Sequence, residues 1–374
     1  MYSDEDIERA VVAGVLTPQA AAALRDHATG TGEAGADEEN FRLVTGFNDI
    51  FVTIAGILVL VGAGWIGGAI GTWGGGAAVA AVSWGLAEYF TWIRRMALPS
   101  IVFFLSFVGG LYIAAVTIYP TGGDGSLLGF MTNSAIFSSA AAGAPGMAAA
   151  VSRSFLIAQT LAAALIVGAC WLHWQRFRVP ITVAVGVAAI ARFVFSLITV
   201  AAYPHFGQWL LFLLLATGLA IFAYAMHWDG QDRLRTTRRS DVAFWLHLAA
   251  SPLIVHPIFV LLGINIGLDQ TSGQVAAALL AIVIYLLLAI VALAVDRRAI
   301  LVSALVYVLA AAIYLVYQTG ATNLGFPVAI IVIGSGLLML SALWQRIRAV
   351  VLPLFPASVR ERVPPVRLPG YRAT

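Results

Sequence analysis

Long apolar stretches recur from residue 48 onward, and arginines occupy every second gap between them. A helix rises about 1.5 Å per residue, so about 20 apolar residues cross the hydrocarbon core of a bilayer. The pattern predicts an all-α polytopic integral membrane protein with about ten transmembrane helices. The expected spans are 48–70, 72–93, 97–119, 154–174, 180–202, 206–227, 242–263, 275–295, 299–317 and 325–344.

The placement of the arginines predicts an orientation. Arginines follow the second, fourth, sixth, eighth and tenth spans, and the alternate gaps hold none except Arg153. Cytoplasmic loops of membrane proteins are enriched in basic residues, so both termini are expected in the cytoplasm. The same rule accounts for the net charge of +3 without a nucleic-acid partner. A hydrophobic fraction of 61% and a charged fraction of 10% also exclude an ordinary soluble domain.

The basic residues and the single cysteine suggest where the protein resides. All 21 basic residues are arginine, which we interpret as the bias of a GC-rich bacterial genome. Together with the apolar spans, this predicts the bacterial inner (cytoplasmic) membrane, with the lipid bilayer as partner. Residues 1–8 are acidic and no signal peptide is recognised, so the first apolar run is expected to remain as a span. The lone Cys170 excludes an intrachain disulfide and thiolate metal sites.

The chain divides into four predicted regions. Residues 1–28 form a short soluble helical hairpin, because Gly14 ends one helix and Thr17-Pro18 starts the next as N-cap and N1. Residues 29–47 form an acidic linker and juxtamembrane segment, 48–345 the transmembrane domain, and 346–374 a basic, proline-rich, extended cytoplasmic tail. The long connection 120–152 either lies on the membrane surface or enters it as a re-entrant loop.

Three stretches resemble a family of uncharacterised bacterial polytopic inner-membrane proteins, a domain of unknown function with an N-terminal cytoplasmic helical hairpin. They are ERAVVAGVLTPQAAAALRDHA from Glu8, FRLVTGFNDIFVTIAGILVLVGA from Phe41 and FWLHLAASPLIVHP from Phe244. The resemblance implies the architecture and the location described above. It implies no activity and no catalytic residues.

Four ionisable residues lie inside the predicted spans: Glu88, Arg192, His247 and His256. Each costs about 2.5–3.5 kcal/mol on insertion scales, so each is expected to face protein, water or another polar group. Counting from the span ends places Arg192 about 18 Å and His256 about 21 Å from the inner surface. Glu88 and His247 lie about 7–8 Å deep. These depths allow two layers of contact, Arg192 with His256 and Glu88 with His247.

The seventh span carries two prolines, Pro252 and Pro257, that predict a helix break and free two backbone carbonyls. Ser251 follows His247 by one helical turn and lies on its face. Freed carbonyls beside histidines suit a cation or proton site in a transporter. The alternative is a structural network in which neighbouring helices satisfy the freed groups. Arg192 similarly admits either an anion pathway or a structural clamp to backbone carbonyls.

Small and polar residues inside the spans predict close helix contacts. Gly64/Gly68 and Gly67/Gly71 are small-xxx-small pairs that favour tight helix packing, with dimerisation as the alternative. Gln159 lies in the outer part of the fourth span. The favoured interpretation is that it forms an interhelical hydrogen bond, and the alternative is that it lines a solute path.

Two classes of function remain open. The first is a permease or ion-coupled transporter of a small solute, centred on Arg192, His256 and the seventh span, with Glu88 and His247 as inner gate or proton relay. The second is a membrane-embedded sensor or assembly scaffold whose hairpin and basic tail bind a cytoplasmic protein or anionic lipid. No enzyme, cofactor or metal site is expected. His247 and His256 lack the i, i+4 spacing of a helical zinc pair, and no nucleophile with a base is evident.

Overall fold

The computed structural model describes residues 4–24, 47–118, 153–201, 209–233, 235, 237–262, 275–318 and 325–366. All secondary structure in these residues is helical, which confirms the all-α class. The chain forms two units, Met1–Phe41 with Val366–Thr374, and Arg42–Pro365. The linker prediction for 29–46, the question of re-entry at 120–152 and the last tail residues, 367–374, lie outside the described residues.

The first unit contains the beginning of the predicted hairpin. Helix α1, Asp4–Val12, ends before Gly14, which adopts a left-handed φ of 71° that glycine tolerates well. The chain is helical again over 18–24, with Pro18 at the first helical position. The Thr17 hydroxyl accepts a hydrogen bond from the Ala20 amide at 3.1 Å, as expected for an N-cap.

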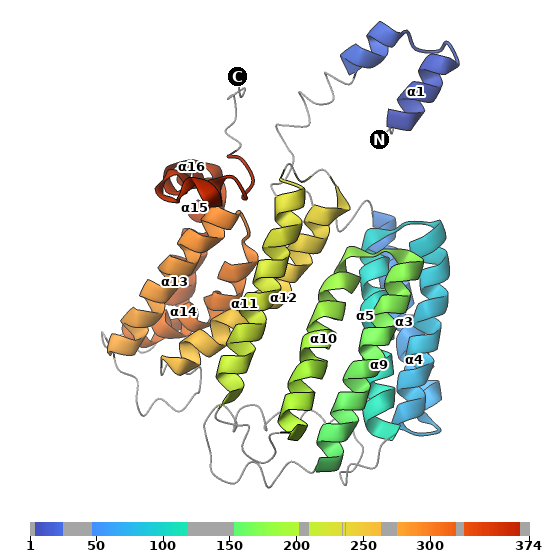
Figure 1. Cartoon of the computed structure of the whole chain (residues 1–374), viewed down its shortest axis with the longest axis horizontal. Coiled ribbons are helices and arrows are strands. Elements are labelled where there is room, and N and C mark those ends of the chain that lie inside the picture. Colours follow the sequence, from blue (N-terminus) through green and yellow to red (C-terminus); the bar gives the residue numbers. More distant parts are fainter. Residues whose placement is uncertain are drawn as a thin grey trace. The chain divides into compact units, whose positions relative to one another are not determined.

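The second unit is a bundle of helices connected in chain order (Figure 1). Some helices extend beyond the expected spans at their arginine-rich ends. For example, α11 continues to Gln231, and α12 already begins at Arg238. The bounds are α3 Phe47–Gly68, α4 Thr72–Ala87, α5 Ala97–Ile118, α9 Arg153–Phe177, α10 Pro180–Ala201, α11 Leu210–Gln231, α12 Arg238–Leu261, α13 Val275–Val295, α14 Ala299–Gln318, α15 Gly325–Ala342, α16 Trp344–Val351 and α17 Ala357–Arg360.

Seven of the described helices are long and apolar enough to cross a membrane. An eighth span results if Pro327–Ala342 and Trp344–Leu354, which are bent by 75° at a short break, are counted together. The structure therefore supports a multi-pass membrane protein. The seven are Phe47–Gly68, Ala97–Ile118, Ile157–Phe177, Ile181–Ala201, Leu210–Gln231, Arg238–Leu261 and Val275–Val295.

The two remaining expected spans are also helical. In 72–93, the α-helix α4 stops at Ala87 and the chain continues as a π-helix over Glu88–Ile93. In 299–317, α14 is a helix of 20 residues, Ala299–Gln318, and its apolar stretch is followed as far as Leu315 in the part of the chain whose side chains the structure describes. The length criterion therefore counts seven to eight spans among the described residues, where the sequence led us to expect ten.

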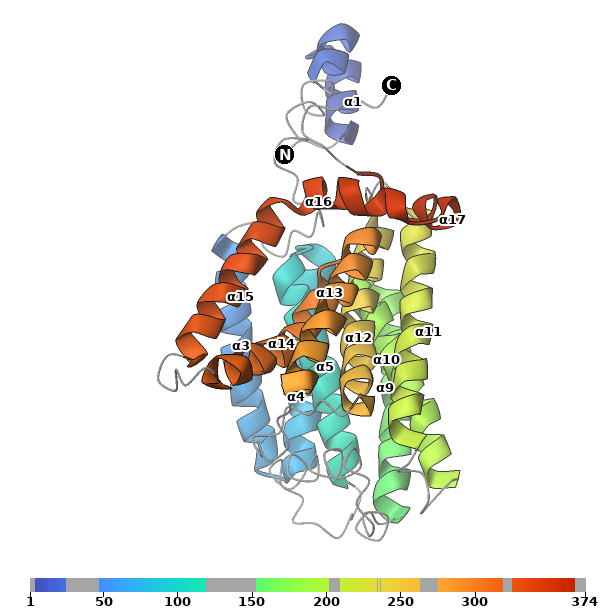
Figure 2. The ribbon, with the colours of Figure 1, turned by 90° about the vertical axis from the view of Figure 1, so that its left-hand side faces the viewer.

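The helix of the seventh span is continuous through its two prolines. Helix α12 runs without interruption from Arg238 to Leu261 and contains both Pro252 and Pro257. Each proline removes only one backbone hydrogen bond, and the packing of α12 against α10, α11 and α14 supports the helix on both sides of that loss. The sharp bend in this part of the bundle instead lies between α15 and α16 (Figure 2).

Close backbone contacts join α3, α4 and α5. A Cβ atom added at Gly67 would lie within 3 Å of the Gly74 carbonyl oxygen of α4, and one at Gly76 would lie 2.6 Å from the Gly110 carbonyl oxygen of α5. Any larger side chain there would separate the helices. The small-xxx-small pattern thus reflects, at Gly67, close packing within the chain.

The C-terminal region is folded where an extended tail was expected. Residues 344–351 form α16, followed by a 3₁₀ turn over Leu352–Leu354 and by α17. Ile347 and Val351, one turn apart, pack against the core around Trp344, Leu293 and Ile300. The prolines and arginines of this segment favour an extended tail, but these apolar residues fold it against the bundle.

Candidate functional site

Arg192 lies in the middle of α10 within a cluster of neutral polar groups. One of its terminal nitrogens donates to Gln159 Oε1 on α9 at 3.1 Å. The Tyr112 hydroxyl on α5 donates to the same oxygen at 2.6 Å and also interacts with Arg192. Among the described residues, no carboxylate bonds Arg192. We call Tyr112, Gln159 and Arg192 the Arg192 cluster.

His256 has a different partner from the expected one. Its Nδ1 lies 2.5 Å from the Tyr307 hydroxyl of α14, and the Tyr307 ring stacks on Phe259. The histidine side chain lies at the protein surface, whereas Tyr307 is buried. No hydrogen bond or ion pair joins His256 to Arg192 in the described part of the chain. Arg192 and His256, which were expected to meet because of their similar depth, therefore belong to two separate sites.

Glu88 lies on the π-helix that follows α4, and it pairs with Arg176 near the end of α9. Both guanidinium-to-carboxylate bonds are present, at 3.1 and 2.7 Å. The guanidinium also lies over the Trp92 ring, 4.1 Å from its centroid. The Glu88 and Arg176 side chains are 36% and 38% exposed, so the pair lies at the surface of the protein. His247, the expected partner of Glu88, lies elsewhere.

His247 lies beside a fully buried ion pair between α11 and the α13–α14 turn. Arg297 donates to both carboxylate oxygens of Asp229, at 2.5 and 3.2 Å, and to the Ser240 carbonyl oxygen at 3.1 Å. His247 Nδ1 lies 3.7 Å from the Asp229 carboxylate and 2.8 Å from the Ala243 carbonyl oxygen. Asp229 and Arg297 are each 1% exposed. Ser251, also buried, donates to the His247 carbonyl oxygen at 2.6 Å.

Asp296, next to Arg297 in the chain, is the centre of a second buried group. One oxygen accepts from Arg235 at 3.0 Å and the other from the Trp344 indole at 2.7 Å. Asp296 and Arg235 both have left-handed φ angles, 61° and 56°, which cost energy for residues other than glycine. The bonds between their side chains help to hold these backbone conformations in place.

Arg348 of α16 connects this group to the last described residues. Its Nε donates to the Leu293 carbonyl oxygen at 2.9 Å, and its terminal nitrogens donate to the carbonyl oxygens of Pro364 and Pro365 at 2.5 and 3.0 Å. Arg348 is fully buried. We call Asp229, Arg235, Asp296, Arg297, Trp344 and Arg348 the arginine–aspartate network. It fastens the ends of α11 and α13, the turns beside them, and α16 together.

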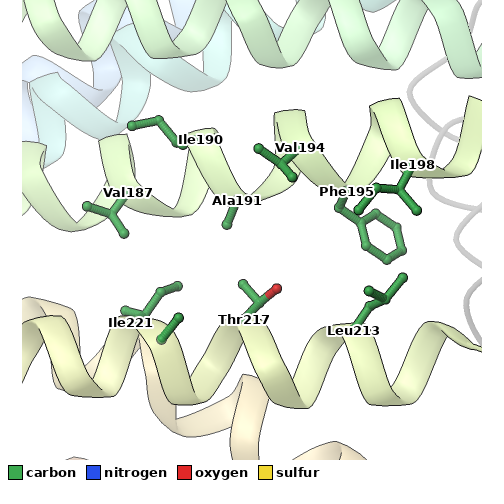
Figure 3. A pocket seen from close by; sticks show the side chains of 10 residues that line it. Val187, Ile190, Ala191, Val194, Phe195, Ile198, Leu213, Thr217 and Ile221 are labelled. Atoms are coloured by element: carbon green, nitrogen blue, oxygen red, sulfur yellow. The ribbon is translucent and has the colours of Figure 1, made fainter.

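Two of the cavities between the described helices are apolar along most of their length, and neither of these two is lined by the predicted polar residues. The larger, about 290 Å³, lies between α10 and α11 and has almost only apolar walls (Figure 3). Ala191 and Val194 line it, whereas Arg192 between them bonds toward α9. The smaller, about 150 Å³, lies between α14 and α15.

The sequence located the polar side chains but assigned the wrong contacts. Arg192, Glu88, His247 and His256 each bond a group that depth matching did not select. Tyr112 and Tyr307 resembled ordinary aromatic residues of apolar helices. The network was missed because its arginines lie in the basic gaps, where positive charge is usual. A carboxylate directly before two arginines, as at Asp296, was the available signal.

No group of three or more His, Cys, Asp and Glu side chains that could hold a metal ion occurs among the residues that the structure describes. Comparisons of the chain with protein-family models, with curated proteins and with solved structures give no match. The resemblance to a bacterial inner-membrane family therefore stays a prediction, and the function has to be argued from the geometry.

Proposed function

We propose that the protein is a multi-pass membrane permease for a small anionic solute, with Arg192 as the fixed positive charge of its binding site. The observation that carries the proposal is the bonding of Arg192 to neutral groups alone among the described residues. An arginine keeps its proton at any physiological pH, and a charge at membrane depth needs compensation. A small anion provides that compensation, and Gln159 and Tyr112 offer further polar atoms to hold it.

The other polar residues fit a permease that is closed toward the cytoplasm. Glu88–Arg176 and Asp229–Arg297 lie at the arginine-rich end of the helices, and His247 adjoins the second pair. We propose that these ion pairs form the inner gate. His256 with Tyr307 is a candidate relay for a coupling proton, since an imidazole can both accept and donate a proton.

The topology that we propose is the one expected from the sequence. All ten segments are counted as spans, with 72–93 and 299–317 included, and both termini lie on the cytoplasmic side of a bacterial inner membrane. Support comes from the alternation of arginine along the chain. It also comes from the helical structure of both additional segments.

A sensor or assembly scaffold is the second candidate function. The arginine–aspartate network favours it, because it fastens α16 and the segment up to Pro365 to the membrane helices. Such a connection would transmit a change in the bundle to a cytoplasmic protein. The apolar walls of the cavity between α10 and α11 favour it as well.

Thiol labelling tests the permease without knowledge of the solute. In a Cys170→Ser background, Gln159→Cys places the only thiol of the chain beside Arg192. Reconstituted protein is treated with membrane-impermeant thiosulfonates of equal size, one anionic and one cationic. We expect labelling, with the anionic reagent reacting several times faster. Adding Arg192→Gln should remove that preference.

The control is Arg178→Gln in the same background, because Arg178 is an exposed arginine at the end of α9. It should leave the preference unchanged. A second control is Arg239→Cys in the Cys170→Ser background, because Arg239 is exposed and its thiol should react. If this control reacts and Gln159→Cys is labelled from neither side of the membrane, no aqueous path reaches Arg192, and the scaffold is favoured.

A further inference from the structure

The smaller cavity combines an apolar slot with a cationic end. Leu301, Val302 and Leu305 of α14 form one wall, and Leu337 and Leu340 of α15 form the other. Arg298, Ser341 and Trp344 line the cavity at the ends of these helices. This distribution of one charged end and a long apolar remainder matches the chemistry of a phospholipid.

The cationic end is held in position by its neighbours. The Arg298 guanidinium lies over the Trp344 ring, 5.0 Å from its centroid, and donates to the Ser341 hydroxyl at 3.3 Å. Trp344 is itself fixed by its bond to Asp296. Tryptophan and arginine are the residues that typically mark the boundary between hydrocarbon and headgroups. The bend of 75° before α16 lies between Ser341 and Trp344, which both line the cavity.

We infer that this cavity binds an anionic phospholipid of the adjacent leaflet, with its phosphate beside Arg298 and one acyl chain between α14 and α15. The volume of about 150 Å³ suits a segment of such a chain, since an apolar cavity of about that size accommodates benzene. The inference rests on the membrane location alone and is independent of the proposed transport function.

Charge complementarity selects an anionic lipid over a neutral one. Arg298, just before α14, and the exposed Arg346 of α16 contribute positive charge at this end of the cavity. A phosphodiester accepts charge-assisted hydrogen bonds from a guanidinium particularly well.

Native mass spectrometry of the full-length protein in detergent tests the inference. Phosphatidylglycerol and phosphatidylcholine with identical acyl chains are titrated, and bound lipid is counted. We expect preferential retention of phosphatidylglycerol by the unchanged protein. Arg298→Gln should lower its apparent affinity about tenfold, the factor that corresponds to about 1.4 kcal/mol. Arg298→Lys, which keeps the charge, should retain most of it.

A matched pair of substitutions tests the apolar slot. Val302 and Val306 are both exposed on α14, at 63% and 52%, but only Val302 lines the cavity. Val302→Trp should therefore abolish the retention of phosphatidylglycerol, and Val306→Trp should leave it unchanged. The unfolding temperature of each variant, measured without added lipid, separates loss of binding from loss of folding.

Several outcomes would overturn the inference. Equal retention of both lipids would remove the role of Arg298, and unchanged retention by Val302→Trp would remove the acyl slot. Full competition by soluble glycerol 3-phosphate would assign the site to a free phosphate. A dimer in the spectrum that Val302→Trp dissociates, with no lipid preference, would assign the groove to a second copy of the chain.

Discussion

Arg192 and Arg297 are the same kind of side chain in opposite surroundings. Arg297 is 1% exposed and bonds both oxygens of Asp229, so its charge is balanced within the protein. Arg192 is half-buried and bonds neutral oxygen atoms among the described residues. The partner of a buried charge, more than its depth, therefore indicates whether the charge supports the fold or is available to a ligand.

The largest difference between the two arginines is expected in their contribution to stability. Asp229→Asn leaves Arg297 buried without its counter-charge, and breaking a buried ion pair in this way costs about 3–5 kcal/mol. We expect a loss of that size in the free energy of unfolding. It is measured by thermal or denaturant unfolding of the purified protein in detergent micelles.

The matched control for this prediction is the double variant Asp229→Asn/Arg297→Gln. Because it removes both charges, it should recover a substantial part of the lost stability. If the single variant costs about 1 kcal/mol or less, a range typical of exposed pairs, the network does not clamp the helices as proposed.

The attachment of the C-terminal segment should show an intermediate effect. Arg348→Gln leaves the carbonyl oxygens of Leu293 and Pro364 without their donor, and each unsatisfied buried group costs about 1–3 kcal/mol. We expect faster trypsin cleavage at Arg360 and Arg362, which are exposed and follow α16 in the chain. Arg346→Gln, exposed on the same helix, should cleave at the original rate. Equal rates for the two variants would contradict the anchoring role.

The sequence predicted the helical class and the positions of most helices because the apolar stretches are long and the arginines interrupt them regularly. The lengths were less predictable. Apolar length alone gave no sign that α4 ends at Ala87 in a π-helix. The prolines of α12 do not interrupt its helix, because tertiary packing supports a helix that has lost single hydrogen bonds.

The candidate site was less predictable than the fold, because contacts between helices depend on rotation about each helix axis as well as on depth. Glu88 and His247 lie at similar predicted depths yet bond Arg176 and the Asp229 region instead of each other. Gln159 was correctly interpreted as an interhelical hydrogen-bonding residue. Its two partners depend on the neighbours of α9, which periodicity does not identify.

A smaller effect is expected at Glu88–Arg176, which resembles the network chemically but is more than one third exposed. Exposed pairs contribute about 0–1 kcal/mol, and salt screens them. Glu88→Gln should therefore lower the free energy of unfolding by less than about 1 kcal/mol, with a smaller difference at high ionic strength. A loss as large as that of Asp229→Asn would show that this pair is desolvated by the membrane and belongs with the buried network.

The smallest effect on stability is expected at Arg192 itself. Arg192→Gln removes a charge that has no bonded carboxylate in the described residues, and the remaining groups are neutral, so the free energy of unfolding should change by about 1 kcal/mol or less. The same substitution should abolish the preference of Gln159→Cys for the anionic thiosulfonate. The combination separates the two roles, because a charge kept for a ligand affects binding and spares the fold. A loss of several kcal/mol from Arg192→Gln would instead place Arg192 with Arg297 as a structural clamp, and the permease proposal would lose the observation that carries it.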